Sequence, residues 1–184
     1  MFVINAGSVR LTRRVFEESV LVETLGRGAV CGDIAFADGA SYPVTAVAVD
    51  DVEAVVVPRE AVSTVLLTNP AVVERLLSRM AARLTYAHFR VAAFALRDPL
   101  ARLMLQLRHE AERAGALDGA AFVPIPYDLP EALATEAAVV DSGLRALAAD
   151  GLLELDAGGR FRLAAADAFD RKLRYLELRD RFES

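Results

Sequence analysis

The stretch that decides the fold is residues 69–96, NPAVVERLLSRMAARLTYAHFRVAAFAL. Asn69-Pro70 is a typical helix start, because asparagine caps helices and proline is tolerated at the first helical position. Apolar residues then recur at alternating steps of four and three, which is the a/d pattern of a coiled-coil seam. The stretch therefore predicts one long helix that pairs with a second copy of itself through Val73, Leu77, Met80, Leu84, Ala87, Val91 and Phe94.

A second interpretation of this helix stays open, in which it packs only on the core of its own domain. Arg75, Arg79, Arg83 and Arg90 flank the apolar positions and keep the stripe narrow, whereas a core-facing helix normally has a wider apolar face. A narrow stripe sustained over about three heptads favours the dimer.

The residues before this helix predict an antiparallel β structure. Apolar and β-branched runs alternate with glycine-containing and acidic turns, and short strands at such regular spacing are typical of a roll or sandwich. A short helix beginning at Pro58 should then lead into the long helix. We expect strands at residues 2–4, 9–12, 19–22, 44–47 and 52–57.

The residues after it predict helices followed by a hairpin, which is the order of a winged helix-turn-helix. Thr135 should cap the second helix of the motif, and Gly151 should end that helix. A charged helix should close the chain. We expect helices at residues 99–114, 129–134, 135–150 and 167–182, a short strand at 122–125, and a hairpin of 152–155 with 161–163.

Four segments, in register along the chain, carry a family resemblance. They are INAGSVRL at 4–11, GAVCGDIAF at 28–36, the helix start with MAARL at 80–84, and LRALAADGLL at 144–153. Together they resemble the family of cyclic-AMP receptor protein and its oxygen-sensing, FNR-type relatives. The resemblance implies an α+β fold with an effector-sensing β-roll (1–68), a dimerisation helix (69–96) and a winged-helix DNA-binding domain (97–184). It also implies a shortened roll with an open edge, because the family's N-terminal helix and first strands have no counterpart.

The function that the resemblance implies is that of a dimeric bacterial transcription regulator that binds duplex DNA. By register, the family's base-contacting positions fall at Ala137, Ala138 and Ser142, where its usual Arg and Glu are absent. The turn position that is usually glycine in the family falls at Ala134 or a neighbour. The alternative is a dimer of the same fold that has lost specific DNA recognition and acts through proteins such as RNA polymerase. The candidate DNA contacts are Thr135, Ala137, Ala138, Ser142, Arg145 and Arg160.

The resemblance also marks an effector site in the roll. Gly32-Asp33 stands where nucleotide-binding members have a Gly-Glu pair for the ribose, and Ser41-Tyr42 lies where their Arg binds the cyclic phosphate. A buried phosphate without a cationic partner loses its strongest hydrogen bonds. We therefore expect no response to cyclic nucleotides, and Asp33 and Tyr42 are alternatively residues of a turn and its packing. A response would imply a substitute cation, Arg10 or Arg83 of the long helix.

Composition excludes several other classes of protein. The single cysteine, Cys31, excludes an internal disulfide and a four-cysteine metal site. His88 and His109 have no partners at metal-ligand spacing, and no nucleotide-cradling loop or nucleophile elbow occurs. We expect no enzyme activity, no cofactor and no metal.

Charge and hydropathy bear on compartment and partners. No long charge-free apolar run and no secretory signal occur, so we expect a cytoplasmic protein without membrane contact. The formal net charge is −5, but residues 69–114 hold eight Arg against four acidic residues. Any contact with a duplex therefore depends on local clusters of arginine.

Overall fold

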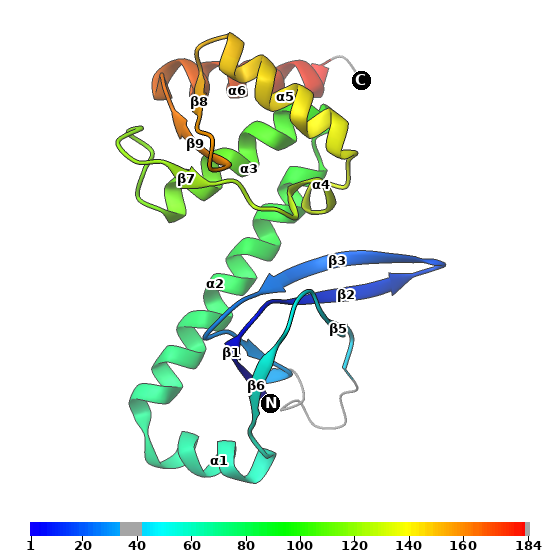
Figure 1. Cartoon of the computed structure of the whole chain (residues 1–184), viewed down its shortest axis with the longest axis vertical. Helices are drawn as coiled ribbons and strands as arrows, with labels where there is room; N and C mark the ends of the chain where they lie inside the picture. Colours follow the sequence, from blue (N-terminus) through cyan, green and yellow to red (C-terminus); the bar gives the residue numbers. More distant parts are fainter. Residues whose placement is uncertain (34–41, 183–184) are drawn as a thin grey trace. The chain divides into compact units, whose positions relative to one another are not determined.

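The computed structural model describes residues 1–33 and 42–182. The chain forms two compact units, Met1–Leu84 and Thr85–Ser184, and the division falls inside the long helix α2. Strands lead into helices, and a small sheet returns in the second unit, as Figure 1 shows along the chain. The α+β class expected from the sequence is confirmed.

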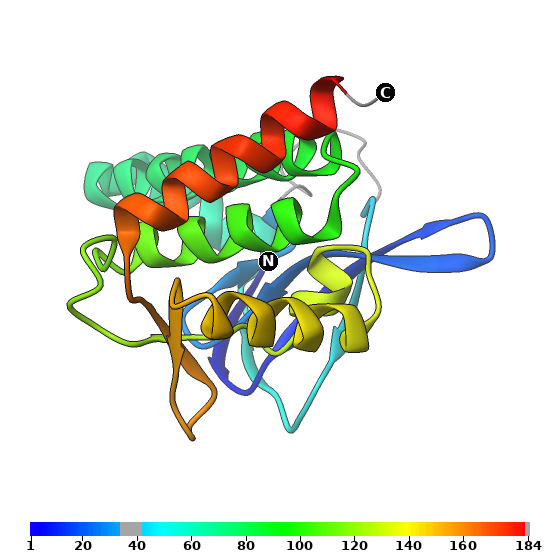
Figure 2. The same cartoon turned by 90° about the horizontal axis from the view of Figure 1, so that it is seen from above.

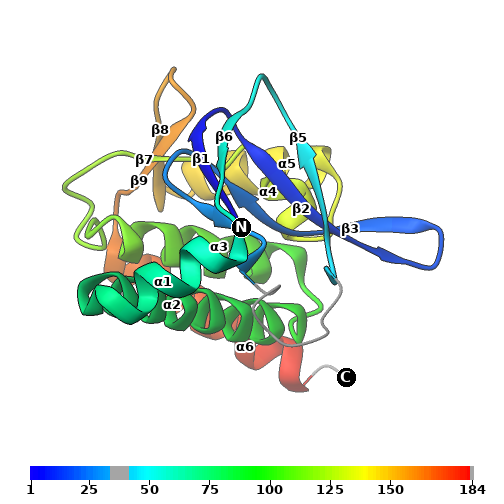
Figure 3. The same ribbon diagram turned by 90° about the horizontal axis from the view of Figure 1, so that it is seen from below.

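The first unit contains two antiparallel sheets, with strand orders β4-β1-β6 and β3-β2-β5. The hairpin of β2 and β3 is the longest pairing, and it extends well past the segment of β2 that pairs with β5 (Figure 3). The strands are β1 (Phe2–Ala6), β2 (Val9–Val15), β3 (Glu18–Leu25), β4 (Val30–Cys31), β5 (Thr45–Ala48) and β6 (Glu53–Val56).

The core of this roll follows the period of two that strands impose on side chains. Val9 and Leu11 are buried, while Arg10 between them is only half-buried. Ile4 and Leu25 complete the buried cluster. The five strands expected from the sequence are confirmed. β4 was missed, because a two-residue strand has no detectable period.

Helices α1 (Arg59–Thr68) and α2 (Pro70–Phe94) follow the strands. Asn69 ends the first and begins the second: its N–H donates to the carbonyl of Val65, and its carbonyl accepts from Val72 N–H at 3.0 Å. The predicted long helix is confirmed, and its last residues loosen into three-residue turns at Ala95 and Leu96.

The second unit packs helices around a small sheet of order β7-β9-β8. Figure 2 shows α6 running alongside α3. The buried centre is apolar and includes Leu107, Leu147, Phe161 and Phe169. The elements are α3 (Pro99–Arg113), β7 (Val123–Pro124), α4 (Leu129–Ala132), α5 (Ala137–Ala149), β8 (Leu153–Leu155), β9 (Arg160–Leu163) and α6 (Ala166–Phe182).

The turn between α4 and α5 departs from the expectation in one respect. The prediction that Thr135 caps α5 is wrong: Glu136 holds the cap position, and Thr135 N–H donates to the carbonyl of Pro130 at 3.0 Å. The turn position predicted at Ala134 is confirmed, since Ala134 has φ +49. An alanine there is strained, because the left-handed region crowds its Cβ.

Candidate functional site

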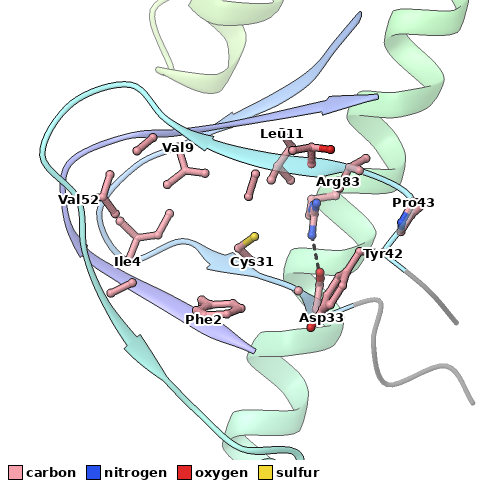
Figure 4. A pocket seen from close by; sticks show the side chains of 16 residues that line it. Phe2, Ile4, Val9, Leu11, Cys31, Asp33, Tyr42, Pro43, Val52 and Arg83 are labelled. Carbon is pink, nitrogen blue, oxygen red and sulfur yellow. Dashed lines mark hydrogen bonds and ion pairs between the residues drawn. The ribbon is translucent and has the colours of Figure 1, made fainter. Parts of the chain in front are cut away.

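A cavity of about 620 Å³ lies within the roll (Figure 4). Residues of both sheets line it, and apolar side chains make most of the wall. Its size is that of pockets which enclose drug-sized ligands. The apolar lining consists of Phe2, Ile4, Val9, Leu11, Val44, Ala46, Ala48, Val52 and Ala54.

Polar groups gather at one end of the cavity, where Arg83 of α2 meets Asp33 (Figure 4). The Arg83 Nη1 donates to Asp33 Oδ2 at 2.7 Å, and Nε donates to Glu23 Oε2 at 2.9 Å. Nη2 lies 2.9 Å from the same Glu23 oxygen in an ion pair. All three side chains are partly buried. Burial opposes the charge of Arg83, but the two carboxylates outweigh it and raise the pKa of the guanidinium. One cation is therefore shared by two anions.

Three of the four predicted effector residues line this cavity. Gly32, Asp33 and Tyr42 line the cavity, whereas Ser41 lies outside the described residues. Gly32 has φ +81, and a Cβ there would lie 3.2 Å from the ring of Tyr42. This glycine therefore allows the tyrosine to pack closely beside the polar end.

Cys31 also lines the cavity. Its thiol is half-buried, and burial and the charge of Asp33 raise its pKa. A raised pKa keeps the sulfur as an unreactive thiol, so Cys31 serves as a small apolar residue of the wall.

Sequence reasoning missed Glu23 as a partner of Arg83. Part of the signal was available: Glu23 lies two residues before the buried Leu25, and in the folded sheet it faces the buried Leu11 of β2. A carboxylate in that register needs a cation or other donors.

The predicted dimer seam is largely exposed in the single chain. Leu77 and Leu84 are 60% and 58% exposed, and Val91 is 71% exposed. Met80, Ala87 and Phe94 are also exposed, while Val73 is half-buried. The other faces of α2 are used differently: Arg83 turns into the roll, and Ala93 is buried.

Within the second unit, α2 is joined to α3 by aromatic stacking. The His109 ring lies 4.2 Å from the ring of Phe89 and 5.4 Å from that of Tyr86. Burial lowers the pKa of His109, and its Nε2 is buried without a hydrogen-bond partner among the described residues. His109 is therefore a neutral packing residue, and His88 is exposed.

The winged-helix surface begins with α5. Val140, Leu144 and Leu147 anchor the helix, and Gly143 allows close packing, because a Cβ there would lie 2.6 Å from Leu103. On the other side the predicted contacts Ala137, Ala138, Ser142 and Arg145 are exposed, and Thr135 is half-buried just before them.

The arginines of this surface differ in their partners. Arg145 makes no ion pair with Asp141 or with any other residue in the described part of the chain. Arg160 is paired with Asp156 at 2.6 Å and holds the pKa of that carboxyl low. Arg162 is paired with Glu154 at 2.6 Å. Both wing arginines also lie over the ring of Phe122.

A contact that the sequence did not predict joins α6 to the segment between α2 and α3. Asp180 accepts the backbone N–H groups of Arg97 at 2.9 Å and Asp98 at 3.1 Å. Arg179 pairs with the Asp98 carboxylate, which also caps α3 through Leu100 N–H at 2.8 Å. The C-terminal helix thus fixes the start of α3.

Comparison with known proteins identifies which family of folds this chain resembles. The family model "Cyclic nucleotide-binding domain" matches residues 1–69. A CRP/FNR-family transcriptional regulator from Thermus thermophilus is 17% identical, with a TM-score of 0.57 over 94% of this chain and 87% of that one. The chain has the CRP/FNR fold. The predicted resemblance is thereby confirmed at the level of fold.

Two further structures with this CRP/FNR fold are similar over most of their length. FixK2 from Bradyrhizobium japonicum is 18% identical, with a TM-score of 0.69 over 92% of this chain and 85% of that one. A CooA mutant from Carboxydothermus hydrogenoformans is 15% identical, with a TM-score of 0.73 over 94% and 78%. A search of curated proteins found no significant match. Over the described residues, no helix is both long enough and apolar enough to cross a bilayer.

Proposed function

We propose that this chain is a cytoplasmic, dimeric transcription regulator that binds duplex DNA through its winged helix. The observation that carries the proposal is the bare outer side of α5, held on α3 by Gly143 and followed directly by the β8–β9 hairpin. The functional divisions that we propose are the roll (1–68), the dimerisation helix (69–96) and the winged-helix domain (97–184).

The chemistry of α5 supports contact with a major groove. Small side chains at Ala138 and Ser142 allow the helix backbone to approach base edges closely, and Ser142 can donate or accept a hydrogen bond. Arg145 is exposed and without an ion pair among the described residues, so its guanidinium is available to a guanine.

The wing supports phosphate contact, but at reduced strength. Arg160 and Arg162 already have carboxylate partners, so a phosphate must compete with Asp156 and Glu154. Since binding to phosphates releases counterions in proportion to the charges neutralised, we expect a shallower dependence on salt than for a wing with free arginines.

The exposed seam on α2 supports a dimer. Pairing two copies along an a/d stripe would remove its leucines and methionine from water. A two-fold dimer presents two α5 helices to half-sites about one DNA turn apart. The target should therefore be a near-palindromic sequence.

Binding to DNA tests the proposal directly. Fluorescence anisotropy of a labelled random duplex, titrated with the full chain at several salt concentrations, should give affinities that fall as salt rises. Fragments selected from random DNA should bind more tightly than the random duplex. No binding to either, at the lowest salt that keeps the protein dispersed, would contradict the proposal.

One observation favours a second function, in which the fold serves as a protein-binding dimer with a partner such as RNA polymerase. Residues 115–151 hold six acidic residues and a single Arg, and the nearby wing arginines are paired with acids. Acids near a duplex repel its phosphates. A dimer that binds RNA polymerase but neither duplex would indicate this function.

A further inference from the structure

We propose that the roll cavity binds an uncharged, largely apolar small molecule and discriminates against anions, cyclic nucleotides included. The role of that molecule as an effector rests on the proposed function, but its binding does not.

The side chains that line the cavity favour an apolar ligand. Ile4, Val9 and Leu11 are buried around the cavity, and Val52 and Phe2 face the same space (Figure 4). Water against these walls finds few of the two to four polar partners that it needs. A ligand with a hydrocarbon body replaces that water and makes dispersion contacts with the walls.

The polar end selects against negative charge. Among the described residues that line the cavity, Arg83 is the one basic side chain. Its guanidinium is already bonded to both Glu23 and Asp33. The guanidinium and its two carboxylates together carry a net charge of −1, which repels an anion. To bond Arg83, the anion would also have to displace one of the carboxylates, which would then lose its partner while partly buried. Leaving a buried charge without its partner is costly.

The same end can still bind neutral polar groups. The Asp33 carboxylate keeps lone pairs beyond the one that Arg83 uses, and the Tyr42 hydroxyl can donate or accept. A ligand with one or two hydroxyl, carbonyl or amide groups at one end of a hydrocarbon body would match both parts of the cavity.

Arg83 links the binding of such a ligand to the proposed dimerisation helix. It lies on α2 directly before Leu84, a predicted seam residue, while its side chain reaches the cavity. A ligand that bonds Asp33 or Tyr42 alters the surroundings of Arg83. The position of this turn of α2 would then depend on whether the cavity is filled.

Two dyes that differ by one charge test the ligand class. N-phenyl-1-naphthylamine is uncharged, and 8-anilino-1-naphthalenesulfonate is the same skeleton with a sulfonate. Titrating each into the full chain without DNA should show saturable fluorescence, with the uncharged dye binding at least about tenfold more tightly. Millimolar cyclic AMP should not displace it. Equal affinity for the two dyes, no saturable binding of the uncharged dye, or its displacement by cyclic AMP would overturn the proposal.

Matched variants locate the dye and test the role of charge. Ala46 lines the cavity while Val47, the next residue of β5, does not. Ala46→Phe should weaken the uncharged dye about tenfold, and Val47→Phe should change it less than about twofold. Glu23→Gln with Asp33→Asn frees the charge of Arg83, so the preference against the sulfonate should shrink at least about tenfold. An unchanged preference, or equal effects of the two phenylalanine variants, would refute the site.

Because all of these titrations omit DNA, they separate this proposal from the proposed function. If the chain binds the uncharged dye but no duplex, the ligand proposal is supported and the DNA-binding function is refuted. If the chain binds DNA but fails the dye tests, the DNA-binding function is supported and the proposed ligand class is refuted.

Discussion

Replacing Leu84 and Val91 together by glutamate should convert the proposed dimer into a monomer. The two residues lie one heptad apart on α2 and are 58% and 71% exposed in the single chain. Full burial of such a side chain contributes about 2 kcal/mol, so pairing along the seam gains roughly 2–3 kcal/mol per chain from this pair of residues, and about 5 kcal/mol per dimer. Losing that burial alone raises the dimer Kd about 10³- to 10⁴-fold.

The substitution also places four carboxylates in the seam, and their desolvation and mutual repulsion add to the loss. Sedimentation equilibrium at micromolar concentration measures the result, with wild type expected as a dimer and the double variant as a monomer. Because both side chains are exposed in the single chain, its fold should survive, and the circular dichroism spectrum should keep its helical content.

A matched control adds the same charge away from the stripe. Ala82 and Ala92 are exposed on α2 and lie outside the a/d positions. Ala82→Glu with Ala92→Glu should leave the dimer intact. A monomeric wild type would refute the seam, and so would a control variant that dissociates as completely as the seam variant.

Four further results are expected. Arg145→Ala should cost about 1–3 kcal/mol of DNA binding and relax the preference at one base pair per half-site, whereas Arg160→Ala should weaken all sequences alike; anisotropy with a selected and a scrambled duplex measures both, and no change with either duplex would count against the winged helix. Millimolar cyclic AMP should leave the melting temperature unchanged, because only a ligand that binds the folded state stabilises it; a shift of several degrees in differential scanning fluorimetry would contradict this. Ala134→Gly should raise the free energy of unfolding by about 0.5–1 kcal/mol, since φ +49 suits glycine, and urea denaturation that shows destabilisation would show the turn to be unstrained. Asp180→Asn replaces one of two accepting oxygens at the start of α3 and should cost about 1–2 kcal/mol in the same assay; an unchanged midpoint would mean that α6 does not fix that turn.

The candidate site could be anticipated only in part. Gly32, Asp33 and Tyr42 were placed in the roll by their resemblance to a nucleotide site, and they do line the cavity. The sequence left the cation of this site open between Arg10 and Arg83, and it did not predict that Arg83 would pair with Asp33. Arg83 lies 50 residues away along the chain from Asp33, and a helix pattern does not specify which distant side chain an arginine on its flank will meet.

The sequence by itself determined the elements of this protein, except for the two-residue strand β4. The four-three spacing of residues 73–94 specifies a long helix, and the period of two at Val9 and Leu11 specifies a strand with one buried face. Such patterns succeed because they are local: the geometry of a single helix or strand converts spacing into a face. The order of helices and hairpin after Asp98 followed in the same way.

Only the tertiary structure decided which ion pairs Arg83 makes and where the roll cavity lies. Whether Arg83 is free to bind a phosphate depends on Glu23 and Asp33, which the folded roll brings to it from two separate segments. The cavity depends on which side chains fail to fill a volume between two sheets, a property of the packed set and of no single stretch. Side-chain pairing and packing are long-range, so the ligand class of the roll becomes visible only when distant residues share one site.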